Sequence, residues 1–272
     1  APPPTRMAST PHGLWTAPAS WQAVDLLSDL HLQASEPDTF DAWRAHMQGT
    51  SADAVLLLGD VFEVWVGDDA LEHDPFLQAC AEVLRQTSAQ RSVAFMPGNR
   101  DFLVGDAFLQ ACGVQRLQDP TVLVWGAQRI VLSHGDALCL DDEAYQRFRA
   151  VARTPQWQAE FLARPLAERL ALAQSMRAQS EAHNQSMHSF ADADAAMTRT
   201  WLTELGSTHL IHGHTHQPAD HAVPGLNGAQ RQVLSDWHVD TVPADSASTD
   251  GAPRRAQVLR LHADGRRERL SA

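Results

Sequence analysis

The chain contains five short apolar runs, and each has the length of a β-strand. Nearly continuous apolar runs are typical of strands that are covered on both faces. Helix-like segments, such as residues 74–86, lie between several of the runs. This alternation predicts an α/β fold, in which a layered sheet structure is flanked by helices. The runs are AVDLLSD, ADAVLLLGD, RSVAFMPGNRD, QRIVLSHGD and STHLIHGHTH.

Polar side chains stand at the carboxyl end of every one of these runs. In chain order the ends carry Asp29, Asp60, Asn99, His134 and the histidines that begin at His212. Open α/β sheets bind ligands outside the carboxyl ends of their strands. We therefore expect the five strand ends to converge on one site.

The regions outside the apolar runs differ in composition. Residues 1–20 are rich in Pro, Ala, Ser and Thr, which predicts a flexible extension before a single domain at 21–272. Between the fourth and fifth runs, residues of about 145–205 favour helix, with apolar positions at helical spacing. We expect a helical insertion there that acts as a lid. The later segments RQVLSDW and AQVLRLHADG are expected to form closing antiparallel strands.

Charge and cysteine content narrow the possible binding partners and cellular compartments. The formal net charge is −12 and the chain contains no lysine, which disfavours general nucleic-acid binding. The three cysteines form no C-x-x-C pair, which favours free thiols in a reducing compartment. No apolar run has the length of a membrane span and no leader pattern begins the sequence. These features favour a cytoplasmic protein, with attachment to a membrane surface left open.

The strand-end residues are of types that bind divalent cations. Asp29 and His31 are two residues apart, so in an extended chain both face the same way and can hold one cation. Asn99 adds a neutral oxygen, and Arg100 beside it is a planar donor suited to phosphate. Each motif alone also fits a plain structural role: Asp29 can cap a helix, and aspartates such as Asp60 are common in turns.

The stretch IHGHTHQP places three histidines, His212, His214 and His216, on alternate positions. Alternation directs side chains to one face of an extended strand. The residues alone are compatible with a metal site, a proton relay or a solvated edge strand.

Taken together, the motifs D-x-H, GD, GN-x-D, HGD and HGHTH resemble those of the calcineurin-like metallophosphoesterases in type and order. The resemblance implies two metal ions bridged by Asp60. One would be held by Asp29, His31, Asp60 and His214, and the other by Asp60, Asn99, His134 and His212. His216 is left without an assigned ligand role, and a supporting role is favoured. The ligands are mixed nitrogen and oxygen donors without thiolate, which fits Mn²⁺, Fe²⁺ or Zn²⁺.

Longer runs are similar to one branch of this family, the UDP-2,3-diacylglucosamine diphosphatases of lipid A biosynthesis. These runs are GDVFEVWVGDD, GNRDFLVG, HGDALCLDDEAYQRFR, HGHTHQP and VLSDW, and Arg100 stands where many family members have histidine. The resemblance implies two Mn²⁺ ions and hydrolysis of the pyrophosphate of UDP-2,3-diacylglucosamine to UMP and 2,3-diacylglucosamine 1-phosphate. Catalytic roles fall to Asp60, Asn99 and Arg100, and the implied substrate contacts are Asn99, Arg100, Asp142, Ser180, Asn184 and His212.

The same resemblance gives the lid a purpose, because two acyl chains need an apolar groove. Met187 stands where the branch has a substrate-binding lysine, so that contact is missing, and His188 or Arg177 are candidates to replace it. A lipid substrate implies peripheral contact with the cytoplasmic face of the inner membrane. We expect neither a nucleic-acid partner nor an obligate protein partner. Two other hypotheses remain: a phosphoesterase of different specificity, and a non-catalytic scaffold, which predicts broken ligand motifs.

Overall fold

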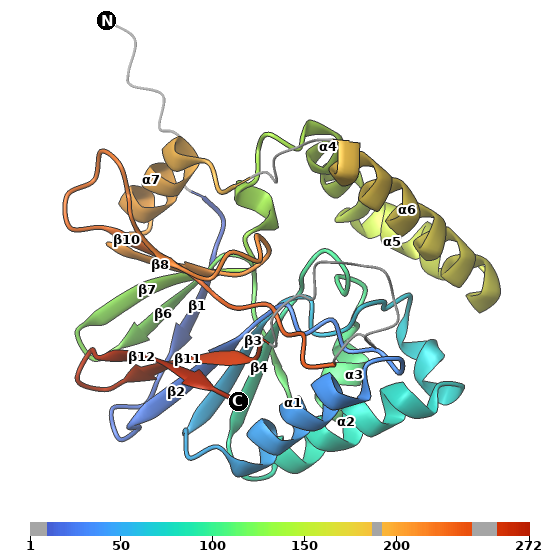
Figure 1. The fold of residues 1–272 in the computed structure, drawn as a ribbon, viewed down its shortest axis with the longest axis horizontal. Coiled ribbons are helices and arrows are strands. Elements are labelled where there is room, and N and C mark those ends of the chain that lie inside the picture. Colours follow the sequence, from blue (N-terminus) through green and yellow to red (C-terminus); the bar gives the residue numbers. More distant parts are fainter. Residues whose placement is uncertain (1–9, 187–191, 241–254) are drawn as a thin grey trace, which may run out of the picture.

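Two six-stranded sheets form the centre of the protein (Figure 1). The computed structural model describes residues 10–186, 192–240 and 255–272, and the side chains of residues 179–186 lie outside this description. Sheet A has the strand order β1 (Gly13–Thr16), β6 (Thr121–Trp125), β7 (Gln128–Ser133), β8 (His209–His212), β10 (Gln230–Val233) and β9 (Asp220–Ala222). Sheet B has the order β12 (Arg267–Ser271), β11 (Gln257–His262), β2 (Ala23–Leu27), β3 (Ala54–Leu58), β4 (Ser92–Met96) and β5 (Gln115–Arg116).

The two sheets pack face to face, because their strands are apolar on both sides. On β3, Leu56 and Leu58 point into the core between the sheets, together with Leu132 of β7 and Ile211 of β8. The alternate residue Leu57 packs on the other face, toward helices. The layered α/β sandwich predicted from the continuous apolar runs is confirmed.

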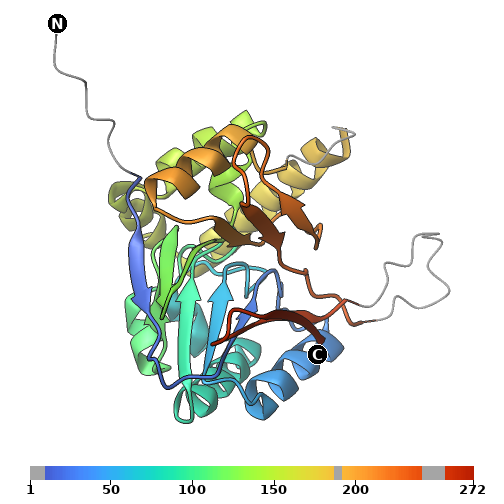
Figure 2. The same ribbon diagram turned by 90° about the vertical axis from the view of Figure 1, so that its left-hand side faces the viewer.

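Helices cover the outer faces of the sandwich (Figure 2). Sheet B is covered by α1 (Pro37–Gly49), α2 (Pro75–Ser88) and α3 (Asp106–Ala111), and sheet A by α7 (Ala195–Glu204). The helix expected at 74–86 is confirmed as α2: Asp74 caps it by accepting hydrogen bonds from the backbone N–H groups of Phe76 and Leu77. Two short 3₁₀ helices are η1 (Asp68–Glu72) and η2 (Asp136–Leu138).

Three further helices stand together beside the carboxyl ends of the strands (Figure 1). They are α4 (Glu143–Ala152), α5 (Pro155–Leu162) and α6 (Leu166–Ser186), and we call them the lid. All three fall in the chain between β7 and β8, where helix was expected. In contrast, α7 packs on sheet A through Trp201 and Leu202, so it belongs to the core. That the lid is an insertion into the family fold stays a prediction.

The beginning of the chain contributes more to the fold than its composition suggested. Residues 13–16, expected within a flexible extension, form β1 at the edge of sheet A and pair with β6 in parallel. Trp15 fixes this strand because its side chain is buried between the sheets and its indole N–H donates to Gln115. The extension expected at 1–20 is therefore corrected, and its residues 1–9 lie outside the described part.

The closing strands follow the prediction only in part. As expected, β11 is antiparallel to both of its neighbours, β2 and β12. In RQVLSDW, however, β10 runs parallel to β8, and its antiparallel partner is the short edge strand β9. β10 therefore lies between β8 and the edge strand β9, parallel to the first and antiparallel to the second. The sequence carried no sign of so short a strand.

The state of the cysteines and the character of the helices can be compared with the predictions from the sequence. Cys80, Cys112 and Cys139 are buried and free, as the sequence predicted. Among the helices of the described residues, none combines the length and the apolar character needed to cross a membrane.

Asp25 on β2 is the centre of a buried charged cluster away from the strand ends. Arg260 donates to both of its carboxylate oxygens at 2.7 and 2.9 Å, and the hydroxyl of Thr50 donates at 2.6 Å. Burial alone would raise the pKa of Asp25, but these hydrogen bonds and His46 lower it to about 2. The cluster therefore favours the ionised carboxylate and stabilises the folded state at neutral pH.

We expect Asp25→Asn to lower the free energy of unfolding at pH 7 by about 3 kcal/mol, because it leaves Arg260 without its buried partner. Since the folded pKa lies below the unfolded one, the stability that Asp25 contributes is present above about pH 4 and is lost as the pH falls toward 2. Urea unfolding in a chelating buffer between pH 7 and pH 2 measures this. The difference in the free energy of unfolding between wild type and variant should shrink as the pH falls. A difference that is constant with pH would contradict the lowered pKa of Asp25.

A candidate two-metal centre at the strand ends

The polar ends of the five strands converge, as the sequence predicted. Strands β2, β3 and β4 run parallel in sheet B, and β7 and β8 run parallel in sheet A. Their carboxyl ends bring two groups of metal-binding side chains together, each with ligand atoms within 4.8 Å of one another. One group is Asp29, His31 and His216, and the other is Asp60, His134 and His214.

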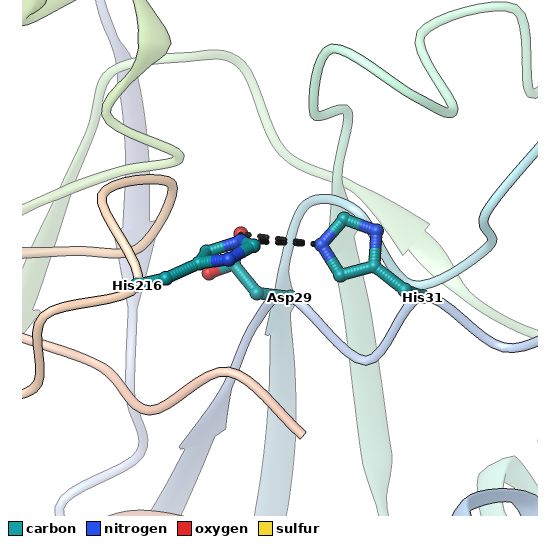
Figure 3. Close-up of side chains that lie close together, drawn as sticks. All are labelled: Asp29, His31 and His216. Carbon is teal, nitrogen blue, oxygen red and sulfur yellow. Dashed lines mark hydrogen bonds and ion pairs between the residues drawn. The ribbon is translucent and has the colours of Figure 1, made fainter. Parts of the chain in front are cut away.

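The first group joins the loop after β2 to the loop after β8 (Figure 3). Nε2 of His216 lies 3.3 Å from Oδ1 of Asp29 and 3.3 Å from Nε2 of His31. Nε2 of His31 lies 4.0 Å from the same Asp29 oxygen. Two imidazole nitrogens and a carboxylate oxygen thus face one small space, which is a suitable arrangement for one cation.

The second group is built around His134, which is fully buried. Its Nδ1 lies 3.0 Å from the carbonyl oxygen of Leu58, which can only accept, so Nδ1 carries the proton in the neutral ring. Its Nε2 faces Oδ1 of Asn99 at 2.9 Å and Oδ1 of Asp60 at 3.6 Å. Asn99 thus adjoins this group, as the sequence predicted.

Asp60 lies between the two groups. Its Oδ2 is 3.9 Å from Nε2 of His31, and its Oδ1 is 3.6 Å from Nε2 of His134. The backbone N–H of Arg100 donates to Oδ1 at 2.8 Å and helps to fix the carboxylate. One buried carboxylate therefore offers an oxygen to each group, which is the position that a bridging ligand requires.

The backbone is strained where the candidate ligands stand. Among the described residues other than glycine, five have a positive φ between 47° and 69°, and all five belong to the two groups. Such left-handed conformations cost about 1–3 kcal/mol each and persist where function requires them. These five are Asp29, His31, Asp60, His214 and His216.

Two glycines allow the loops to approach the carboxylates. A Cβ atom at Gly98 would lie 2.1 Å from Oδ1 of Asp60, and one at Gly213 would lie 2.2 Å from Oδ2 of Asp29. Any side chain there would displace a candidate ligand, so the G-N and G-H steps of the motifs are steric requirements.

The carboxylates of the site favour positive charge at His134. Burial alone would lower the pKa of His134, but the carboxylates of Asp60, Asp29, Asp136 and Asp119 raise it to about 9. Burial would likewise raise the pKa of Asp29, yet the hydrogen bond from His216 and nearby histidines lower it below its usual value. With carboxylate, imidazole and amide donors and no thiolate, the donor set fits hard or borderline divalent cations.

The histidines are grouped differently from the expectation. His212 and His214 were expected to hold the two metals, whereas the structure places His214 with Asp60 and His216 with Asp29. The reason is that β8 ends at His212, so the alternation of an extended strand does not continue. Beyond it the backbone is left-handed at His214 and His216, which directs both side chains to the site.

His212 is engaged elsewhere. Its Nδ1 donates to the carbonyl of Gly213 at 2.8 Å, and its Nε2 lies 3.1 Å from Nη1 of Arg231. Burial and the Arg231 charge lower the pKa of His212 to about 4, so the ring is neutral and accepts a hydrogen bond. Arg231 is held in turn by Asp192 through two hydrogen bonds. The expected metal and substrate roles of His212 stay a prediction, beside these contacts with Arg231 and Gly213.

Asp101 clamps the loops that carry Asp60 and Asn99. Its buried carboxylate accepts hydrogen bonds from the backbone N–H groups of Gly98 at 2.8 Å and Val61 at 2.7 Å, and also from Asp60 at 3.2 Å. The sequence showed Asp101 as the last residue of GN-x-D but could not show what it contacts.

Asp136 ties the lid to the loop that carries His134. Its carboxylate accepts hydrogen bonds from Arg149 at 2.8 Å and Arg153 at 3.4 Å, and also from Tyr145, all three from α4 or its end. Arg153 also donates to the carbonyl of Gly98 at 2.9 Å. The lid is therefore anchored directly to the two loops of the second group.

A cavity of about 460 Å³ lies between the lid and the site. Most of its wall is apolar and aromatic, with Asn99 and Arg100 among its polar members. Asp142, an expected substrate contact, also lines it and caps α4 by accepting from the N–H of Tyr145. The lining residues are Glu63–Val66, Asn99, Arg100, Phe102, Leu103, Asp142, Ala144, Tyr145, Phe148, Trp157, Phe161, Ala173, Met176 and Arg177.

The other expected lid contacts are not placed. Ser180 and Asn184 lie on α6, but their side chains are outside the description. Met187 and His188 fall outside the described residues.

The sequence matches a known family over most of this architecture. Residues 23–218 match the family model of the calcineurin-like phosphoesterases, and this range includes every candidate ligand. The chain belongs to this family. The calcineurin-like phosphoesterases use a dinuclear metal centre, and the two side-chain groups can hold one. The family resemblance seen in the five motifs is confirmed.

Several relatives that are similar to this chain share one name. A UDP-2,3-diacylglucosamine hydrolase of Chromobacterium violaceum is 45% identical over 79% of this chain and 91% of its own length. A protein of the same name from Chromohalobacter salexigens is 45% identical over 78% of this chain and 87% of its own. A third, from Xanthomonas oryzae pv. oryzae, is 40% identical over 88% and 95%. The resemblance to this branch of the family is therefore confirmed.

Proposed function

We propose that this protein is a metal-dependent hydrolase that splits the pyrophosphate of UDP-2,3-diacylglucosamine into UMP and 2,3-diacylglucosamine 1-phosphate. The observation that carries the proposal is the aromatic cavity beside the metal centre. Asn99 lines this cavity and its Oδ1 lies 2.9 Å from Nε2 of His134. A lipid in the cavity would therefore have its phosphates beside the second group. The name shared by relatives 40–45% identical supports the same substrate.

The proposed ligands follow the geometry. Asp29, His31, Asp60 and His216 would hold one metal ion, and Asp60, Asn99, His134 and His214 the other. We propose Mn²⁺ as the ion in both positions, because mixed nitrogen and oxygen donors suit it. When bound, two such ions supply a water-derived nucleophile near neutral pH and positive charge for the phosphoryl oxygens.

The protein's own side chains would orient the pyrophosphate. Arg100 lines the cavity next to Asn99, and its guanidinium can donate in a planar fork to phosphoryl oxygens. Arg177 of α6 lines the same cavity and adds a second positive charge. The leaving group is a sugar phosphate of low basicity, so the site can work without the histidine that many family members have after the motif asparagine. Asp142, Ser180 and Asn184 remain proposed contacts of the substrate head group.

The lid would serve the lipid part of the substrate. Phe102, Phe148, Trp157 and Phe161 line the cavity and offer the apolar surface that acyl chains need. Large apolar side chains are also exposed on and just before the lid, which supports peripheral contact with the cytoplasmic face of the inner membrane. These exposed side chains are Leu140, Val151, Leu162, Leu170 and Leu172.

A substrate comparison in the presence of Mn²⁺ tests the proposed function. UDP-2,3-diacylglucosamine, UDP-N-acetylglucosamine and an aryl phosphodiester would be compared by kcat/KM. We expect the diacyl substrate to be preferred by at least about 100-fold, because the buried acyl chains contribute binding energy that the other substrates lack. Equal or faster hydrolysis of the aryl ester would favour a phosphoesterase of different specificity. Hydrolysis of none of the three would favour the scaffold hypothesis.

A further inference from the structure

Glu63 lies outside both candidate metal groups and contacts residues on two sides. Its carboxylate is buried, in the loop that follows β3. Its Oε2 lies 2.7 Å from Nδ1 of His31, and its Oε1 lies 2.8 Å from Nη1 of Arg177. Nη1 of Arg100 is 4.0 Å from the same Oε1. One buried side chain thus connects a candidate metal ligand with the two cavity arginines.

The contact with His31 determines how that ring faces the metal site. Because Oε2 of an ionised carboxylate can only accept, Nδ1 of His31 must carry the proton. Nε2 is then the nitrogen that faces Asp29 and His216, 3.3 Å from Nε2 of His216. Partners that orient a ligating histidine in this way commonly affect metal affinity strongly.

The contact with Arg177 holds the lid helix α6 against the loop after β3. A second bridge joins α6 to η1, which follows this loop: Nη1 of Arg169 lies 2.9 Å from Oδ1 of Asp69 and also donates to the carbonyl of Val66. The two bridges pair carboxylates of the segment after β3 with arginines of one helix. They differ in one respect, because Glu63 also bonds a candidate metal ligand.

We propose that Glu63 is a positioning residue that links the metal centre to the lid. One carboxylate oxygen fixes the ring of His31, and the other holds Arg177 of α6 at the wall of the cavity. The inference rests on the proposed two-metal function. Its test measures metal affinity and helix protection, and it requires no substrate.

The test compares Glu63→Ala, Glu63→Gln and the matched control Asp69→Ala. Mn²⁺ affinity is measured by calorimetry, and protection of the α6 amides by hydrogen exchange. We expect Glu63→Ala to weaken Mn²⁺ binding by roughly 10–100-fold and to speed α6 exchange about fivefold. In Glu63→Gln the amide oxygen can still accept from His31, so affinity should stay within about threefold while α6 exchange rises as in the Ala variant. Asp69→Ala should speed α6 exchange and leave Mn²⁺ affinity unchanged.

The outcomes separate this inference from the proposed function. Unchanged Mn²⁺ affinity in Glu63→Ala, or α6 protection equal to wild type in both Glu63 variants, overturns the link alone. Loss of Mn²⁺ affinity in Asp69→Ala equal to that in Glu63→Ala also overturns it, since the effect would then follow lid anchoring in general. A wild-type protein without measurable Mn²⁺ affinity overturns the metal centre itself. Glu63→Gln keeps the test decisive if the Ala variant fails to fold, because the two side chains have nearly the same shape.

Discussion

Replacing Asp60 by Ala is expected to reduce hydrolysis of UDP-2,3-diacylglucosamine by at least about 1,000-fold, because one carboxylate serves both metal positions. Its two oxygens lie 3.9 Å from Nε2 of His31 and 3.6 Å from Nε2 of His134, one toward each group. Removing it also removes the negative charge that, with other carboxylates, raises the pKa of His134. Steady-state release of UMP measures the effect.

Asp25→Asn is the matched control for Asp60→Ala. Asp25 is another buried aspartate, which lies on β2 and is held by Arg260 away from the candidate ligands. At a temperature where both variants are folded, Asp25→Asn should retain wild-type activity. If Asp60→Ala keeps more than about a tenth of the wild-type rate, the bridging position is contradicted.

The second large effect distinguishes two histidines of HGHTH. His216→Ala should lower kcat/KM by at least about 100-fold and weaken binding of one Mn²⁺, because it removes a donor 3.3 Å from Asp29. His212→Gln should retain both ions, since His212 bonds Arg231 and Gly213. The reverse result, with His212 essential and His216 dispensable, would restore the grouping expected from the sequence.

Stability must be measured alongside activity for His212→Gln, so that a loss of folding stability is distinguished from a loss of metal binding. His212 is fully buried and accepts from a buried arginine, so a poor replacement costs folding free energy. Glutamine retains an oxygen that can accept from Arg231. A variant that unfolds more readily and yet binds two Mn²⁺ ions per folded chain fits a structural role.

The convergence of the site could be predicted because it depends on strand direction alone. Parallel strands that each end in a polar residue place those residues at one edge, and this sufficed for Asp29, Asp60, Asn99 and His134. His31 was predicted to join Asp29 on an extended chain. It does join Asp29, but through left-handed backbone at both residues, so the result was right for a different physical reason.

The grouping of the three histidines could not be predicted from their alternation. Alternation assigns faces only while a strand continues, and β8 ends at His212. Where a strand ends depends on the sheet around it. The backbone N–H of Leu234 donates to the carbonyl of His212, and the backbone N–H of Gly213 donates to the carbonyl of His134. These contacts join segments that are far apart in the sequence.

Residues that support the site were missed for a related reason. Asp101, Asp136 and Glu63 were visible as carboxylates near motifs, yet their partners come from other loops and from the lid. Composition predicted helices before β8, but it could not show that α7 joins the core while the lid borders a cavity. The strand at 13–16 was hidden because its flanking residues resemble those of a linker.

Anomalous diffraction from crystals grown with Mn²⁺ tests the two-metal centre most directly. Two peaks are expected, and both should contact Asp60. One should lie among Asp29, His31 and His216, and the other among Asn99, His134 and His214. A single peak, or a peak whose ligands include His212, would contradict the centre described above.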